Sequence, residues 1–182
     1  AVSKRRRNFP EEFLKDARYY SDTEEMLEKE QMDGVVVATP PDVHYPVVKM
    51  AAERGIDIFC EKPMAHTVSD CEKMIAVCRT HNVKLMIAFK HRFSKSFSYL
   101  REKSKDFGSP LWAMYIYPLW KVEDPGWKFQ EKGVRGIIIE NVVHAIDALI
   151  YLMGDIEGVY AEGNRVVFKH PILPDSTVFT MR

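Results

Sequence analysis

The sequence predicts an α/β fold, in which a doubly wound parallel sheet is followed by an α+β region with a large, mostly antiparallel open sheet. Three short apolar segments, 34–39, 56–60 and 85–89, alternate with amphipathic helical segments. This alternation is typical of consecutive strand-helix-strand units in a parallel sheet. After the third segment a helix is followed by long aromatic strand candidates, which favours antiparallel pairing. We therefore expect two domains, residues 1–92 and 93–182.

The first predicted domain begins with a short acidic surface helix at 22–30. The next segment, Gly34–Thr39, is β-branched and continuously apolar, which suits a strand buried on both faces of a sheet. Asp42 can cap the helix that follows, and Gly55 ends that helix.

Two more strands complete this part. The second strand is Ile56–Cys60, and the third is Leu85–Phe89. Between them, Thr67 and Asp70 have the spacing of a capping box at the start of a helix that runs from Val68 to His81. The order predicts right-handed crossovers between parallel strands.

The second predicted domain has a different pattern. A charged helix, 94–107, leads to an aromatic strand candidate at 111–120. A strongly apolar helix covers 136–152, and two further strands are expected at 158–168 and 177–181.

Charge and cysteine content exclude several classes of protein. The chain has 26 basic and 26 acidic residues, so its charge gives no reason to bind nucleic acid or an anionic membrane. No apolar run approaches the ~20 residues that span a bilayer. Cys60, Cys71 and Cys78 are odd in number, and the last two are too far apart on one helix to bridge. Reduced thiols, the absence of a signal peptide pattern and a cytoplasmic location are therefore expected.

Unusual residues follow each predicted parallel strand. In open α/β sheets the ligand lies beyond the carboxyl ends of the strands, where this chain has Thr39–His44, Glu61–Pro63 and Lys90–Arg92. An ordinary loop would account for any one of them. Glu61-Lys62-Pro63 is more specific, because it places an ammonium group at a strand end with a proline holding the backbone, as proton transfer requires.

The apolar helix 136–152 carries a polar stripe. Its ionisable residues Glu140, His144 and Asp147 are four and then three positions apart, so they share one helix face. A single histidine there would most simply be a core residue. Three ionisable groups on a buried face favour a functional site, because unpaired buried charge is costly. The sequence has no paired metal-ligand spacing, no GxSxG and no glycine-rich phosphate loop, so no metal is expected.

Several stretches taken together form a specific pattern: Val35–Pro40 with His44, Ile58–Ala65, Phe89–Phe93, Trp127 and Glu140–Gly154. They resemble the Gfo/Idh/MocA oxidoreductases, which act on sugars and cyclic polyols with a nicotinamide cofactor. The resemblance implies a partial Rossmann domain followed by part of a substrate domain that also carries an oligomer interface. It further implies that the glycine-rich motif of the family lies outside this sequence, so we expect the 182-residue chain itself to bind dinucleotide weakly and to be inactive.

The same resemblance implies roles for individual residues. Lys62 matches a lysine that contacts the reacting hydroxyl, His144 an acid/base histidine and Glu140 a substrate-orienting acid, while Asp147 would orient His144. The implied cofactor residues are Thr39, Pro40, His44, Glu61 and Lys62, and the implied substrate residues are Lys62, Arg92, Trp127, Glu140 and His144.

Ser3, Lys4 and Arg5 stand where Rossmann folds place the residues that read the cofactor ribose. An acid at this point binds a 2′-hydroxyl, and a nearby arginine accommodates a 2′-phosphate. These residues predict NADP rather than NAD, and the alternative interpretation is a solvated basic segment.

The sequence departs from the family pattern at Glu140, where aspartate is usual, and at Val142, where glycine is usual. These departures favour an alternative, a nucleotide- or sugar-sensing relative without turnover, whereas Lys62 and His144 favour an oxidoreductase. A piece of the fold with no function of its own is a third interpretation. Aromatic residues at 112–120 predict a homodimer or homotetramer through the second-domain sheet.

Overall fold

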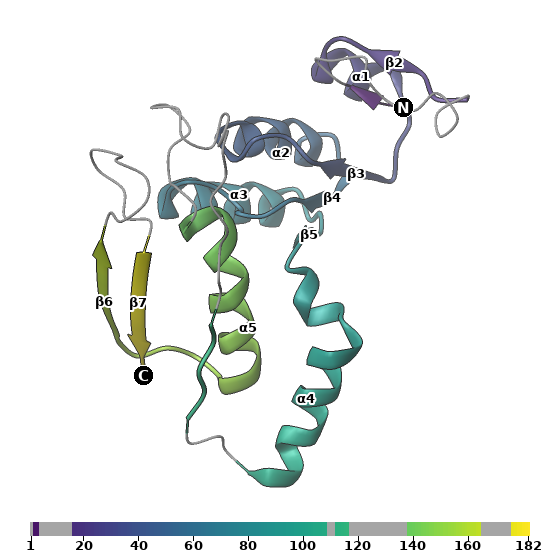
Figure 1. Cartoon of the computed structure of the whole chain (residues 1–182). Helices are drawn as coiled ribbons and strands as arrows, with labels where there is room; N and C mark the ends of the chain where they lie inside the picture. The colour runs from purple at the N-terminus through teal and green to yellow at the C-terminus, as the bar shows by residue number, and fades with distance from the viewer. Residues whose placement is uncertain (1, 4–15, 109–111, 117–137, 165–175) are drawn as a thin grey trace. The chain divides into compact units, whose positions relative to one another are not determined.

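The computed structural model describes residues 2–3, 16–108, 112–116, 138–164 and 176–182, and every structural statement below concerns these residues (Figure 1). The chain divides into two compact units, Ala1–Ala88 and Phe89–Arg182. The domain boundary at residues 92 and 93 stays a prediction.

The first unit contains a three-stranded parallel sheet in the order β3-β4-β5. Its strands are β3 (Gly34–Val37), β4 (Asp57–Cys60) and β5 (Leu85–Ile87), and the helices between them are α2 (His44–Ala52) and α3 (Val68–Thr80) (Figure 1). Val37 pairs with Cys60, and Cys60 pairs with Ile87, so the strands end level at one edge. The strand-helix-strand order predicted for this part is confirmed.

Within the described residues of the first unit, helices cover one face of this sheet. Val37, Ile58 and Cys60 are buried in a core with α2 and α3, whose Val48 and Met74 are fully buried. On the other face the aligned residues of the three strands, Val36, Phe59 and Met86, are exposed. Among the described residues of the first unit, no element packs on that second face, so the expected burial of β3 on both faces is not met there.

Local signals set the helix ends in the first unit. Thr67 caps α3, accepting a hydrogen bond from the Asp70 backbone N–H at 3.1 Å, as the spacing predicts. Asp42 does not cap α2, because it lies inside a short 3-10 helix, η2 (Pro41–Val43), that runs into α2 without a side-chain cap. Gly55, just beyond the end of α2, has a positive φ of 72°, a conformation that glycine adopts at little cost.

The first unit also contains a small pair of parallel strands, β1 (Val2–Ser3) and β2 (Tyr19–Tyr20). The short acidic helix α1 (Thr23–Lys29) follows, capped by Asp22, whose carboxylate accepts from the Glu25 backbone N–H at 3.0 Å. Strand β2 was not predicted, because a two-residue strand has too short a pattern to stand out.

The second unit begins with a turn of 3-10 helix, η3 (Lys90–Phe93), and α4 (Lys95–Phe107). A five-residue π-helical segment, Ile138–Val142, leads into α5 (Val143–Met153). Helix α5 packs against both η3 and α4.

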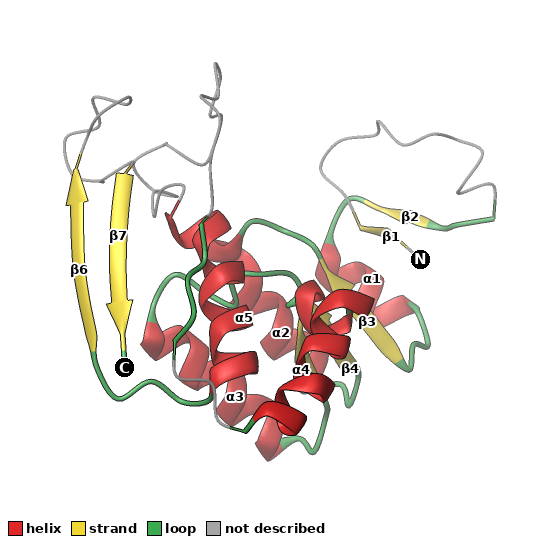
Figure 2. Ribbon diagram, turned by 60° about the horizontal axis from the view of Figure 1, so that its bottom comes forward, coloured by secondary structure: helices red, strands yellow, loops and turns green. Residues whose placement is uncertain are grey.

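Strands β6 (Val159–Asn164) and β7 (Ser176–Met181) form an antiparallel pair, as Figure 2 shows. Both lie within strands predicted from the sequence or within one residue of them. Residues 112–116, part of a predicted aromatic strand, have no strand pairing within the described parts of the chain. No helix among the described residues is long and apolar enough to cross a membrane.

Candidate functional site

Five predicted site residues of the first unit follow the carboxyl ends of β3 and β4: Thr39, Pro40, His44, Glu61 and Lys62. The backbone N–H of Glu61 donates to the Val37 carbonyl at 2.8 Å, which continues the strand pairing one residue past β4. The Glu61 carboxylate then accepts from the backbone N–H of Lys62 at 3.1 Å. Lys62 is half-buried, and the peptide bond between it and Pro63 is cis. The ammonium group of Lys62 is therefore carried on a turn held by the sheet itself.

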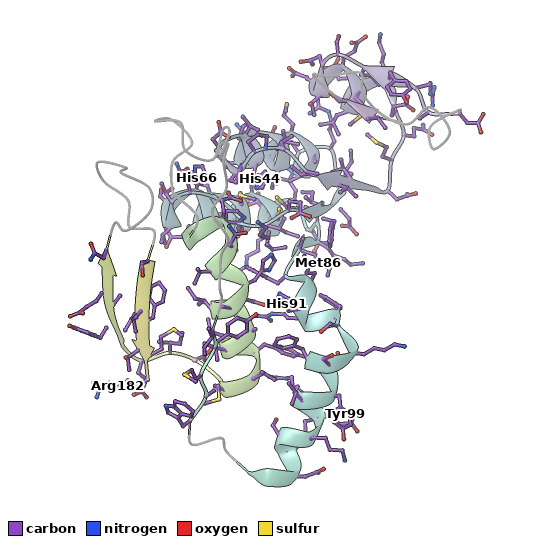
Figure 3. All side chains as sticks on the ribbon, viewed as in Figure 1. His44, His66, Met86, His91, Tyr99 and Arg182 are labelled. Atoms are coloured by element: carbon purple, nitrogen blue, oxygen red, sulfur yellow. The ribbon has the colours of Figure 1, made fainter. Side chains whose placement is uncertain are left out.

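His44, at the start of α2, joins the loops that follow these two strands (Figure 3). Its ring is fully buried, with Nε2 lying 2.8 Å from the Thr39 carbonyl oxygen and Nδ1 lying 3.1 Å from the Met64 carbonyl oxygen. A neutral imidazole donates from one nitrogen only, whereas the protonated ring donates from both. His44 thus ties the loop after β3 to the loop after β4. Its predicted contact with a cofactor stays a prediction.

Thr39 provides a polar atom that suits a ligand. Its hydroxyl oxygen Oγ1 is buried and makes no hydrogen bond within the described residues. Buried hydroxyls normally make a hydrogen bond, so a buried hydroxyl at a strand end that makes none is suited to bind a polar group of a ligand. The carboxyl edge of the sheet therefore offers the Thr39 hydroxyl as a hydrogen-bonding group for a ligand, and Pro40 is exposed next to it.

The remaining predicted cofactor and substrate residues lie elsewhere or outside the described structure. Ser3 ends β1, and its hydroxyl oxygen lies 3.2 Å from that of Thr23. Lys4, Arg5 and Trp127 lie outside the described residues.

In the second unit, the polar stripe of the apolar helix is buried. Glu140, His144 and Asp147 are only 6%, 7% and 6% exposed. The small residues Ala145 and Ala148 share this buried side, whereas the larger apolar side chains of α5 are partly exposed. On this helical segment the ionisable and small side chains are therefore buried, and the larger apolar ones are not.

Arg92 on η3 holds the carboxylate of Asp147. Its Nε lies 3.0 and 2.9 Å from the two carboxylate oxygens, and its Nη2 lies 2.6 Å from Oδ1. These bonds raise the pKa of the Arg92 guanidinium, against the opposing effect of its partial burial. The family resemblance implied that Arg92 contacts the substrate and that Asp147 orients His144. It did not predict that Arg92 and Asp147 bind each other. The available signal was an acidic residue on an apolar helix, which needs a counter-charge.

Aromatic contacts surround this ion pair. The ring of His91 meets that of His144 edge-on, with centroids 5.2 Å apart and planes at 84°. It also lies 5.2 Å from the Phe97 ring. The guanidinium carbons of Arg92 and Arg101 lie 5.4 and 4.4 Å from the centroid of Tyr151, which continues the stripe. His91 was not among the predicted site residues.

Two family models match the chain and cover most of it. One, described as "Oxidoreductase family, NAD-binding Rossmann fold", matches residues 2–89. The other, described as "GFO/IDH/MocA C-terminal domain", matches residues 102–182.

Curated relatives resemble the chain over most of its length. It is 31% identical to a 2,7-anhydro-N-acetylneuraminate hydratase from Mediterraneibacter gnavus, over 85% of the chain and 42% of that protein. It is 29% identical to a D-apiose dehydrogenase from Paraburkholderia graminis, over 82% of the chain and 40% of that protein. The chain therefore spans about two fifths of the length of these relatives.

Solved structures share the fold. The crystal structure of the WlbA dehydrogenase from Bordetella pertussis, in complex with NADH and UDP-GlcNAcA, matches with a TM-score of 0.76 and 24% identity. The match covers 91% of this chain and 49% of that one. The predicted fold class, a Rossmann-type parallel sheet followed by a domain with an antiparallel sheet, is confirmed.

Proposed function

This chain belongs to the Gfo/Idh/MocA oxidoreductase family, and on that premise we propose that its protein transfers hydride between a secondary hydroxyl of a sugar, inositol or related polyol and a nicotinamide dinucleotide. The observation that carries the proposal is the buried stripe that runs from the π-helical segment into α5, where His144 lies between Glu140 and Asp147 in the sequence of the stripe. A buried histidine with acidic neighbours is suited to move a proton at neutral pH.

The proposed roles follow the chemistry of each side chain. A bound nicotinamide would supply the hydride acceptor. His144 takes the proton of the reacting hydroxyl onto its ring. Lys62, an ammonium donor at the end of β4, donates a hydrogen bond to the same oxygen as negative charge develops on it. Glu140 accepts from a neighbouring hydroxyl and so orients the ring of the substrate.

The nucleotide is proposed to lie against the carboxyl edge of the sheet, lined by Thr39, Pro40, His44, Glu61 and Lys62. The unsatisfied hydroxyl of Thr39 supports this placement. A preference for NADP over NAD, read by Ser3, Lys4 and Arg5, is proposed on the basis of their residue types.

The cofactor preference has a direct test in the full-length protein. Ser3→Asp should lower the affinity for NADP relative to NAD, because a carboxylate repels a 2′-phosphate. Ser69→Asp adds the same charge at an exposed position of α3 and serves as the control. A ratio of NADP to NAD dissociation constants that Ser3→Asp leaves unchanged contradicts the preference.

The activity is tested by following cofactor reduction with a panel of inositols, hexoses and sugar acids. His144→Gln should lower kcat by about 10²-fold to 10⁴-fold, as expected for loss of a general base. His81→Gln, at an exposed histidine after α3, should leave kcat unchanged. No turnover with any of these substrates, together with equal cofactor binding by Lys62→Ala and wild type, would instead support the ligand-sensing alternative.

The second unit is proposed to carry the contact between subunits of a homodimer or homotetramer. Trp112, Met114 and Ile116 are all largely exposed, and so is Val178 on β7. Exposed apolar side chains in this number suit a protein interface. Light scattering after size-exclusion chromatography tests the proposal, and a monomer at high concentration contradicts it. The three cysteines are free thiols, which supports a proposed cytoplasmic location.

A further inference from the structure

Two successive residues of the turn η3, His91 and Arg92, contact helix α5 at two positions about one helical turn apart. His91 places its ring edge-on against the His144 ring, with centroids 5.2 Å apart. Arg92 makes its hydrogen bonds to Asp147, three residues further along the same helix face. Figure 3 shows His91 on the segment that precedes α4, beside α5.

The hydrogen bonds between Arg92 and Asp147 restrict the relative orientation of the two side chains as well as attracting them to each other. Nε and Nη2 together engage both carboxylate oxygens, so the plane of the guanidinium and the plane of the carboxylate are fixed relative to each other. The carboxylate is almost fully buried. Rotation of α5 about its axis would break these bonds and leave a buried charge uncompensated, which is strongly unfavourable. The bond therefore sets the direction in which the whole face of α5 points, His144 included.

The turn that carries both residues is itself well anchored. The His91 carbonyl oxygen accepts from the Ser94 hydroxyl at 3.0 Å and from the Ser94 backbone N–H at 3.1 Å. The same Ser94 hydroxyl caps α4 by accepting from the Phe97 backbone N–H, and the Phe97 ring packs on His91. The His91 ring is thus held between Phe97 and His144.

We infer that His91 and Arg92 are positioning residues that fix the orientation of the His144 ring, Arg92 through its bonds to Asp147 and His91 through direct ring contact. The effect on turnover rests on the proposed function, but the effect on the His144 ring does not. For Arg92 this role differs from the substrate contact implied by the family resemblance, and the two roles have different consequences.

The first experiment observes the His144 ring in the 182-residue chain by NMR. Histidine labelled with ¹⁵N gives ring signals for the six histidines, and His144→Gln assigns the signal in question. Arg92→Leu should shift and broaden the His144 ring signals and leave those of His81 unchanged, because His81 lies outside this unit. Arg101→Leu is the matched control, since Arg101 also stacks on Tyr151 but makes no bond to Asp147 among the described residues. It should leave His144 unchanged.

Further variants keep the inference testable if Arg92→Leu does not fold. Arg92→Lys retains the charge without the two-point geometry, so it should give an intermediate change in the His144 signals. His91→Ala should broaden them, whereas His91→Phe keeps the aromatic contact and should restore them. Wild-type His144 signals in a folded Arg92→Leu, or in both Arg92→Lys and His91→Ala, overturn the inference, as does an equal change in Arg101→Leu.

The second experiment uses steady-state kinetics of the full-length protein with a substrate found by the panel above. A positioning residue should lower kcat by about 10-fold to 100-fold and change KM little, because misplacing a catalytic group by about 1 Å has effects of this size. A substrate contact would raise KM with kcat nearly unchanged. A KM effect alone for Arg92→Lys overturns the positioning role. If the wild type turns over no substrate, the proposed function fails, and the NMR experiment still decides the positioning role.

Discussion

Replacing His44 with leucine should remove the connection between the loops that follow β3 and β4 and lower the free energy of unfolding of the first unit. The His44 ring is fully buried and faces two backbone carbonyl oxygens, those of Thr39 at 2.8 Å and Met64 at 3.1 Å. Leucine fills most of the space but donates no hydrogen bond. Each buried acceptor that loses its donor costs about 1 to 3 kcal/mol. At least one of the two carbonyl oxygens accepts a hydrogen bond from the ring, so we expect a loss of about 1 to 3 kcal/mol.

The assay must report on the first unit alone. All three cysteines lie in that unit, and Cys60 and Cys78 are buried in its core, so pulsed thiol labelling across a urea series follows its unfolding. His81→Leu is the control, because that histidine is exposed beyond α3. A His44→Leu variant that loses less than about 1 kcal/mol, or no more than the control, would refute the idea that His44 holds these loops together.

Three further predictions concern the first unit. Burial raises the pKa of the Cys60 thiol to about 12 and also raises that of Cys78. Neither thiol should therefore react with Ellman's reagent in the native chain at mildly alkaline pH. Since the unfolded chain releases these protons first, the free energy of unfolding should fall as the pH rises above the ordinary thiol range, and constant stability there would contradict this. Neighbouring valines of β3 form a matched pair, Val37 being 2% exposed and Val36 67% exposed. Val37→Ala should lower the urea midpoint by an amount equivalent to about 2 kcal/mol and Val36→Ala by less than about 0.5 kcal/mol, and equal losses would mean that the open sheet face is covered. Thr67→Ala should cost about 1 kcal/mol by the same urea assay through loss of the α3 cap, and Thr67→Ser should restore it.

Regular local patterns made the fold predictable from the sequence. The cap at Thr67 depends on contacts within one helical turn, so spacing alone predicts it. The exposure of Val36 could not be predicted, because it depends on which elements pack on that face of β3 rather than on the residue itself. The predicted cap at Asp42 was wrong for a local reason. Pro41 begins a 3-10 turn, and Asp42 lies inside that turn rather than at the start of α2.

The candidate site was predictable only where its residues share one element. Glu140, His144 and Asp147 follow helical periodicity, so their common face could be recognised from the sequence. Arg92 and Asp147 are 55 positions apart, and no periodicity connects residues on different elements. The contact of His91 with His144 was missed for the same reason, because only packing of η3 on α5 creates it.

His44 and Arg92 each connect two segments of the chain through hydrogen bonds, His44 in the first unit and Arg92 in the second. Both are polar side chains that follow a parallel strand and face acceptor oxygens of other segments, two carbonyl oxygens for His44 and a carboxylate for Arg92. An apolar side chain could fill either position but could not set the angle between the joined segments, because hydrogen bonds are directional and apolar contacts are not. Conservative replacements at these two positions should therefore change the orientation of the connected segments more than they change the free energy of unfolding. Asparagine or glutamine at 44 and lysine at 92 keep one bond each, so we expect them to preserve most of the unfolding free energy while loosening the residues that these anchors hold.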